Sequence, residues 1–180
     1  MTRIFTTLAI LSHLVLAAAF LLGWNIGDAT GRDPLIPYHF LTGLGAVVFA
    51  MLVHSIVLTY FMGTGRWLEE TSQAYHLSPE WRQKSQSLKY RTIPAMVVCM
   101  LLLIVTGAFG AAADPASPVG FQGWFGLSGG TIHMLMGILT WGVHAAVNLY
   151  EYSSLERNGV IVNSVLGEVR RIRLERGLEV

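Results

Sequence analysis

Four long apolar stretches run through this sequence, and they decide the class of fold that is open to it. Each is long enough to cross the hydrocarbon core of a bilayer as an α-helix. Of all residues, 53% are hydrophobic and only 13% are charged, a composition outside the range of soluble domains. We therefore predict an all-α integral membrane protein whose residues 1–152 form a four-helix up-down bundle. The predicted spans are residues 4–22, 38–62, 93–113 and 131–152.

The first apolar stretch admits a second interpretation. Arg3 in front of it and the small residues near its end also resemble a secretory signal peptide. The apolar run passes those small residues without an obvious cleavage site, so we expect a retained membrane helix.

The segment 63–91 separates the second and third spans and is polar and basic. Within it, Ser78, Pro79 and Glu80 have the order of an N-cap, a first-position proline and an acidic first turn. We therefore predict a short cytoplasmic helix that starts there and covers about 79–90.

The tail after the fourth span, residues 153–180, is also rich in arginine. An apolar stripe at helical spacing predicts that the tail forms an amphipathic helix, which lies on the membrane surface or against a partner subunit. The stripe consists of Ile161, Val165, Val169 and Ile172.

Basic residues give the predicted orientation. Arg3, the segment 63–91 and the tail fall on one side of the four spans, whereas the loop 113–130 on the other side has no Lys or Arg. Basic loops stay in the cytoplasm. We therefore expect a multi-pass protein of a bacterial-type inner membrane with both termini in the cytoplasm.

Cysteine and motif content leave several function classes without support. The lone Cys99 lies in an apolar run and cannot form an internal disulfide. The sequence has no Walker loop, dinucleotide fingerprint, Cys-x-x-Cys pair or nucleophile elbow. We therefore expect neither hydrolytic chemistry nor a soluble nucleotide cofactor, and we expect no nucleic-acid partner.

Histidines inside the apolar stretches are the candidate functional residues, because a polar ring in a membrane span is costly and usually faces the bundle interior. His39 and His54 lie 15 residues apart, so on one helix their side chains project within ~60° of each other. His133 and His144 lie 11 residues apart and project within ~20° of each other. Each pair therefore shares one face of its helix.

The second and fourth spans run in the same direction in the predicted topology. His39 and His133 then share a depth near the outer surface, while His54 and His144 share a depth nearer the cytoplasm. Two facing helices can bring these four histidines together in two pairs. This is the geometry of two bis-histidine metal cofactors.

Small and polar residues accompany the histidines. Gly43 and Gly137 leave room beside the rings for a flat macrocycle, and the Thr140 hydroxyl is placed to orient a ligand ring by hydrogen bonding. The same small residues also fit plain helix packing, and histidines near helix ends also fit contact with lipid headgroups. The four histidines taken together favour metal ligation.

His13 on the first span is a further candidate, because it lies at an intermediate depth and competes with His54 as the partner of His144. His54 shares both a helix and a face with His39, which favours His54. The residues alone leave the choice open.

Three stretches resemble the four-helix cytochrome b subunits of membrane-bound formate dehydrogenases and nickel-iron hydrogenases. They are YHFLTGLGAVVFAMLVH, LLLIVTGAFG and IHMLMGILTWGVHAAVNLYEY, which together with the tail cover about half of the chain. The resemblance implies two b haems, with His39 and His133 as ligands of the outer one and His144 as a ligand of the inner one. In those relatives the remaining ligand lies on the first helix, which implies His13.

The sequence departs from that family at identifiable points. The first helix lacks the arginine that usually precedes its histidine, and the interval between His133 and His144 is shorter than usual. An arrangement in which both pairs bridge the second and fourth helices is similar instead to the cytochrome b of quinol-oxidising complexes.

The resemblance also implies a function. It indicates a membrane-embedded b-type cytochrome subunit that passes electrons between a quinone pool and a partner redox subunit, rather than a complete enzyme. The alternative is a cofactor-free structural or assembly subunit of a larger membrane complex.

Overall fold

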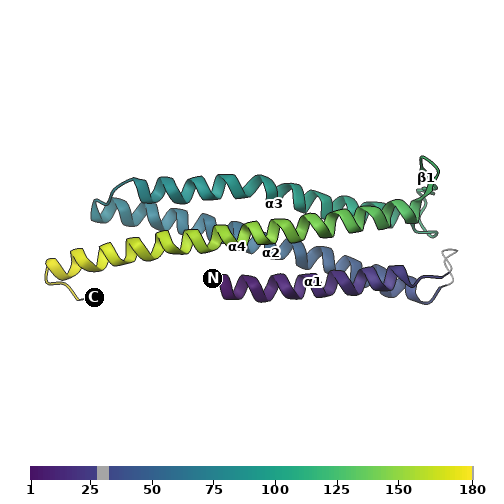
Figure 1. The fold of residues 1–180 in the computed structure, drawn as a ribbon, viewed down its shortest axis with the longest axis horizontal. Helices are drawn as coiled ribbons and strands as arrows, with labels where there is room; N and C mark the ends of the chain where they lie inside the picture. The colour runs from purple at the N-terminus through teal and green to yellow at the C-terminus, as the bar shows by residue number, and fades with distance from the viewer. Residues whose placement is uncertain (28–32, 180) are drawn as a thin grey trace.

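The computed structural model describes residues 1–27 and 33–179, which form four long helices and a two-stranded hairpin (Figure 1). Successive helices run in opposite directions, and the two strands pair antiparallel. The elements are α1 (Thr2–Trp24), α2 (Leu35–Tyr75), α3 (Glu80–Ala113), β1 (Gly123–Trp124), β2 (Leu127–Ser128) and α4 (Gly129–Glu175).

The helices divide the molecule into two parts. α1 packs along α2, and α3 packs along both α4 and α2. α1 is shorter than the other three helices, which continue past its N-terminus (Figure 1). We call the region that includes α1 the four-helix part. The remainder, built from residues 63–91 and 153–175, is the three-helix extension.

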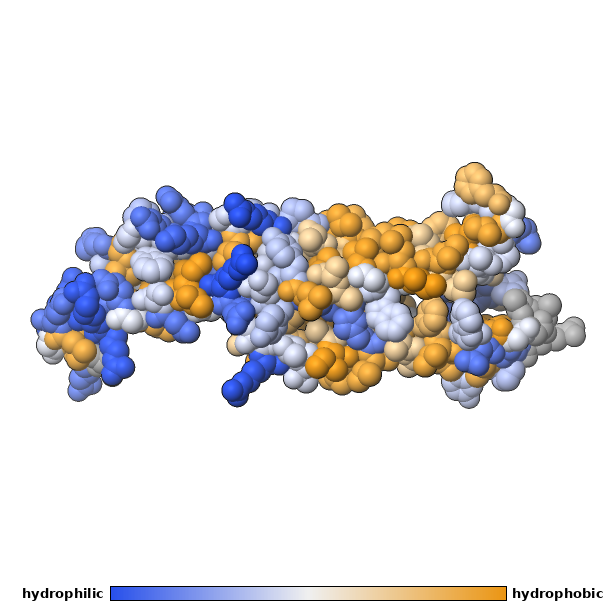
Figure 2. Space-filling view, in the orientation of Figure 1, coloured by the Kyte–Doolittle hydropathy of each residue, from blue (hydrophilic) through white to orange (hydrophobic). Residues whose placement is uncertain are grey.

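The surfaces of these two parts differ in polarity. All four helices contain a window that is long and apolar enough to cross a membrane. Many large apolar side chains point outward, and Leu44, Val48 and Leu101 are each more than half exposed. Figure 2 shows apolar surface over the four-helix part and hydrophilic surface over the three-helix extension. The prediction of four helices able to span a membrane is therefore confirmed.

The core of the four-helix part consists mainly of small and medium side chains. Small residues let helix backbones approach closely, which is how helices associate where lipid surrounds them. Larger side chains close this core where the three-helix extension begins. The small members are Ala9, Ala50, Val53, Val57 and Cys99, and the larger ones include Phe5, Phe61 and Leu155.

The three-helix extension has an apolar core of its own. Leu68 of α2 is buried with Ile161 and Val165 of α4, and Trp67 and Trp81 pack on them. We expected the stripe that contains Ile161 and Val165 to lie on the membrane surface or against a partner subunit. That expectation is wrong, because α2 and α3 continue far enough to cover this stripe inside the molecule.

Buried polar side chains also join the helices of the extension. The Oδ1 atom of Asn158 accepts a hydrogen bond from Ser85 Oγ at 2.7 Å, and its amide nitrogen donates to Thr64 Oγ1 at 3.1 Å. Thr92 Oγ1 donates to Ser154 Oγ at 3.0 Å. These bonds link α4 to α2 and α3 and so fix its register along them.

The two additional helices predicted outside the spans are parts of longer ones. α3 begins at Glu80, directly after Ser78 and Pro79, but it continues through Pro94 to Ala113. The tail is likewise the continuation of α4 and not a separate amphipathic helix. Residues 153–175 contain no proline to stop α4 where the apolar run ends. In α3, Pro94 lies inside the helix without ending it.

The chain termini and the hairpin lie at opposite ends of the four-helix part. The start of α1, the connection between α2 and α3, and the end of α4 all point toward the three-helix extension (Figure 1). The hairpin packs on α4 at the other end of the bundle, the end that also holds the C-terminus of α1 and the N-terminus of α2 (Figure 1). We call this end the loop side.

Candidate functional site

Two groups of histidines lie between the helices of the four-helix part. The first, the loop-side pair, consists of His39 near the start of α2 and His133 near the start of α4. Their ring centroids lie 5.8 Å apart, and their planes cross at 68°. The structure thus brings together the two histidines that the sequence placed at one depth. Both rings are half-buried.

Each ring of the loop-side pair is held by the backbone of the helix beside it. His39 Nδ1 lies 2.8 Å from the carbonyl oxygen of Ala19 on α1, and His133 Nδ1 lies 3.1 Å from the carbonyl oxygen of Thr106 on α3. A carbonyl oxygen only accepts hydrogen bonds, so each Nδ1 carries the proton. The lone pair of each ring is therefore on Nε2.

Glycines on α1 and α3 make room for these two rings. A Cβ atom added at Gly23 would lie 2.7 Å from the His39 ring, and one added at Gly110 would lie 2.8 Å from the His133 ring. Gly23 and Gly110 each follow the residue whose carbonyl binds the ring by four positions, about one helical turn. Any larger side chain at these positions would displace the histidine.

The small residues predicted from the sequence have other surroundings. A Cβ atom added at Gly43 or Gly137 would meet no atom within 4 Å, so both glycines face open space. Thr140 is buried, and its hydroxyl lies 2.7 Å from Thr106 Oγ1. Thr140 therefore supports His133 indirectly, through the residue whose carbonyl holds that ring.

The second group, the mid-bundle cluster, contains His13 of α1, His54 of α2 and His144 of α4, with Cys99 of α3 and Glu151 of α4 beside them. The last four side chains are completely buried. His54 Nε2 lies 3.0 Å from His144 Nδ1, and His54 Nδ1 lies 2.7 Å from Glu151 Oε1. Cys99 Sγ is 3.8 Å from His144 Nδ1. All four helices of the bundle meet at this cluster.

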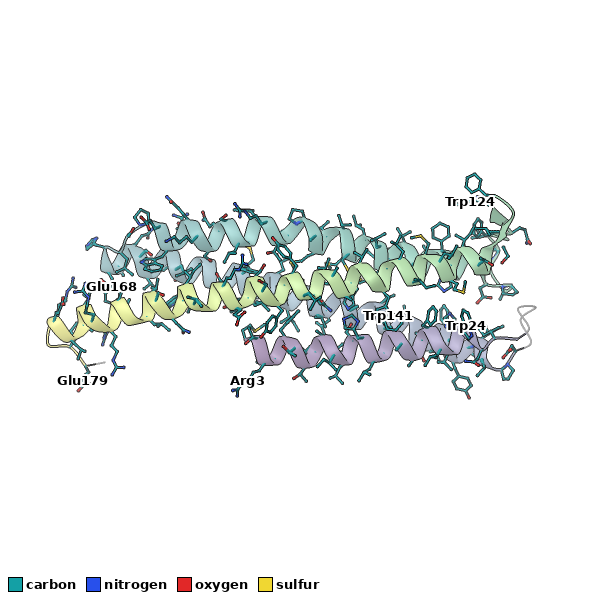
Figure 3. All side chains as sticks on the ribbon, in the orientation of Figure 1. Arg3, Trp24, Trp124, Trp141, Glu168 and Glu179 are labelled. Atoms are coloured by element: carbon teal, nitrogen blue, oxygen red, sulfur yellow. The ribbon has the colours of Figure 1, made fainter. Side chains whose placement is uncertain are left out.

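The other edge of His144 faces α1. His144 Nε2 lies 3.0 Å from Ser12 Oγ and 3.2 Å from Asn148 Nδ2. The His13 ring lies 4.9 Å from the His144 ring, centroid to centroid. His13 Nδ1 accepts a hydrogen bond at 3.0 Å from Trp141, whose indole lies between α4 and α1 (Figure 3).

The facing nitrogens of His54 and His144 are too close together to bind one iron from opposite sides. Two imidazoles that bind one iron from opposite sides place their ligand atoms about 4 Å apart, twice a metal–nitrogen bond. The 3.0 Å between His54 and His144 is a hydrogen-bond distance. His13, the other candidate, accepts a bond at Nδ1, so its proton lies on Nε2, the nitrogen that carries the lone pair in both loop-side rings.

Sequence reasoning missed several contributors to these sites. Gly23 and Gly110 contact histidines of other helices, so spacing along one helix gave no sign of them. The approach of Cys99 to the histidines was missed for the same reason. Ser12 and Trp141 carried a weak signal, because a polar or amphipathic side chain within an apolar span usually faces a partner.

A comparison with protein-family models, with curated proteins and with solved structures finds no match to this chain.

Proposed function

We propose that this protein is a membrane-embedded b-type cytochrome subunit that passes electrons between a quinone pool and a partner redox subunit. The loop-side pair is the observation that carries the proposal. His39 and His133 come from different helices, face each other, and hold their lone pairs on Nε2, the state in which a neutral imidazole binds metal.

The residues around the pair fit a haem. Two imidazoles on opposite sides of one iron have their ring centroids about 6 Å apart, and the observed separation is 5.8 Å. The bonds to the carbonyls of Ala19 and Thr106 supply the orienting contact that metal-ligating histidines need. The open space at Gly43 and Gly137 suits a flat macrocycle beside the rings.

A haem at this position supplies one-electron chemistry, with a potential that depends on its axial ligands and their burial. The protein's contribution is to fix two rings in one tautomer and to surround them with apolar helices. Gly23 and Gly110 let α1 and α3 approach those rings directly. The fixed rings limit the rearrangement that accompanies a change of charge at the site.

The proposal assigns one haem, at the loop-side pair. The mid-bundle cluster does not fit a second haem as the structure arranges it, because His54 Nε2 and His144 Nδ1 lie only 3.0 Å apart, closer than the about 4 Å between two nitrogens on opposite sides of one iron, and His13 carries its proton on Nε2. No step of the proposed function depends on a haem at this cluster.

The remaining features of the proposal concern the setting of the protein. The four-helix part would lie in a bacterial-type inner membrane, where a lipid-soluble quinone reaches it. The basic three-helix extension and both termini would lie in the cytoplasm, as the positive-inside rule predicts. The extension carries exposed ion pairs, among them Arg66 with Glu70 and Arg171 with Glu168, which suit contact with a partner subunit.

The optical spectrum of the purified full-length protein tests this proposal. A reduced α-band of b type is expected in the wild-type protein and is expected to be lost in His39→Ala and in His133→Ala. His76→Ala is the matched control, because His76 is an exposed histidine outside the four-helix part. Colourless wild-type protein from cells supplied with haem would contradict the proposal and favour a cofactor-free structural subunit.

A further inference from the structure

We propose that the mid-bundle cluster is a buried metal site in which His54 Nε2, His144 Nδ1 and Cys99 Sγ bind one thiophilic divalent ion of the zinc(II) type. The three donor atoms come from three helices and lie within 4.8 Å of one another. All three side chains are completely buried. The site shares no donor with the loop-side pair, so it does not rest on the proposed function.

The hydrogen-bond partners around the cluster indicate which nitrogen of each histidine carries the proton, first of all at His13. The Trp141 indole nitrogen is only a donor, so His13 Nδ1 accepts, and a neutral His13 carries its proton on Nε2. That Nε2 lies 3.3 Å from the amide nitrogen of Asn148, which is also a donor. Two donors cannot form a hydrogen bond with each other.

Rotating the Asn148 amide by 180° removes this conflict. Side-chain amide oxygen and nitrogen exchange places in such a rotation. The oxygen then accepts from His13 Nε2. Before the rotation, Asn148 Oδ1 is buried and has no hydrogen-bond partner among the described residues. The rotation brings this oxygen to His13 Nε2 and moves the amide nitrogen to the position that the oxygen held.

The rotated amide also determines the proton on His144. The same Asn148 atom lies 3.2 Å from His144 Nε2, which must now donate to the oxygen. Ser12 Oγ, 3.0 Å from His144 Nε2, is a second acceptor. With its proton on Nε2, a neutral His144 carries its lone pair on Nδ1.

Glu151 determines the proton on His54. Its Oε1 lies 2.7 Å from His54 Nδ1, and an ionised carboxylate only accepts hydrogen bonds, so Nδ1 carries the proton. The lone pair of His54 is then on Nε2. Two lone pairs, on His54 Nε2 and His144 Nδ1, face each other at 3.0 Å. With these proton positions and an ionised Glu151, a positive species, a proton or a metal ion, must lie between them.

Cys99 distinguishes the metal ion from the proton. A proton shared by two imidazoles makes no use of a third donor, whereas zinc and related ions bind thiolate and imidazole together. Bonds of about 2.0 Å to nitrogen and about 2.3 Å to sulfur place tetrahedral ligands about 3.3 Å apart for two nitrogens and about 3.6 Å for nitrogen and sulfur. The observed separations are 3.0 Å and 3.8 Å.

The charges of the cluster are compatible with a divalent ion. A divalent ion, the Cys99 thiolate and the Glu151 carboxylate sum to zero, so the apolar bundle would hold no uncompensated charge. A shared proton with a neutral thiol gives the same sum, so the third donor, Cys99, makes the distinction. Glu151 bonded to the far nitrogen of His54 is the carboxylate–histidine–metal arrangement that surrounds many protein metal sites.

Metal binding by the full-length protein in detergent tests the proposal. The protein is stripped with a chelator, given zinc(II) alone and desalted, and its metal content is measured by mass spectrometry. One zinc per chain is expected in the wild type, and Cys99→Ala should weaken zinc binding at least tenfold. Cobalt(II) in place of zinc should give a thiolate-to-cobalt charge-transfer band that Cys99→Ala abolishes.

Control variants and folding measurements distinguish the loss of a metal ligand from the loss of the fold. Ser55→Ala removes a hydroxyl that donates to the Met51 carbonyl outside the cluster and should keep full zinc occupancy, whereas His54→Gln should lose it. Helix content and elution volume show whether each variant is folded, and Cys99→Ser replaces Cys99→Ala if the latter is not. The b-type spectrum, recorded on the same samples, reports on the loop-side pair separately.

Three results would overturn the proposal: wild-type protein that binds no zinc, zinc binding that is equal in the wild type and the cysteine variant, or a second haem that depends on His144.

Discussion

The loop-side pair and the mid-bundle cluster both use histidines of α2 and α4, yet they present different donor atoms. At the loop side, each Nδ1 donates to a backbone carbonyl, and both lone pairs are on Nε2. In the mid-bundle cluster, the ring partners are side chains, and the lone pairs belong to Nε2 of His54 and Nδ1 of His144. The partner of the second ring nitrogen therefore decides which ligand a histidine pair can accept.

The neighbouring helices explain this difference. Beside the loop-side rings, α1 and α3 present glycines, so the rings lie against backbone and reach carbonyl oxygens. Beside the mid-bundle rings, the same two helices present Ser12, His13 and Cys99, which reach the rings as hydrogen-bonding side chains. At the loop side, the histidine rings are therefore bounded by the backbone of α1 and α3. In the mid-bundle cluster, the rings are surrounded by side chains that can donate or accept hydrogen bonds.

The largest effect is expected from Gly110→Val. The new side chain would begin 2.8 Å from the His133 ring and displace it, so the b-type spectrum should disappear while zinc binding at the mid-bundle cluster stays. Gly107→Val is the matched control, because a Cβ at Gly107 meets nothing within 4 Å. Equal haem content in both variants would show that His133 does not need the slot at Gly110.

A smaller effect is expected from Glu151→Gln. The substitution keeps the shape of the side chain but removes the charge that holds the proton on His54 Nδ1 and balances the bound ion. Loss of such an orienting carboxylate lowers metal affinity by roughly 10–100-fold. Zinc titration against a competing chelator measures this change. The loop-side spectrum should be the same as in the wild type, and an unchanged zinc affinity would remove Glu151 from the site.

Helical spacing in the sequence predicted the histidines of both sites, but it could not predict the residues of neighbouring helices that contact them. The spacing of His39 with His54, and of His133 with His144, placed each pair on one face, and the structure brings all four between the helices. Spacing within one helix says nothing about which residue of a neighbouring helix meets a ring. The contacts of Gly23 and Cys99 with the histidines could therefore be recognised only from the packed structure.

The ends of the helices were predicted less well than their centres, for a related reason. Hydropathy indicates where the apolar surface stops, near residues 62 and 152, but α2 continues to Tyr75 and α4 to Glu175. The continuation is stabilised by contacts between distant residues, such as Leu68 with Val165. A pattern read along one segment cannot contain these contacts.

The smallest effect is expected from Trp141→Phe, which sharpens the assignment of His13. The variant loses the hydrogen bond to His13 Nδ1, a contact worth roughly 0.5–1.5 kcal/mol in the free energy of unfolding. Because His13 is not a donor in the proposed metal site, zinc binding and the loop-side spectrum should both stay at wild-type levels. Chemical denaturation followed by circular dichroism measures the stability, with Trp24→Phe as the control for an exposed tryptophan. A second b-type haem that appears only in Trp141→Phe would show that this indole, by holding the proton of His13 on Nε2, is what keeps haem out of the cluster.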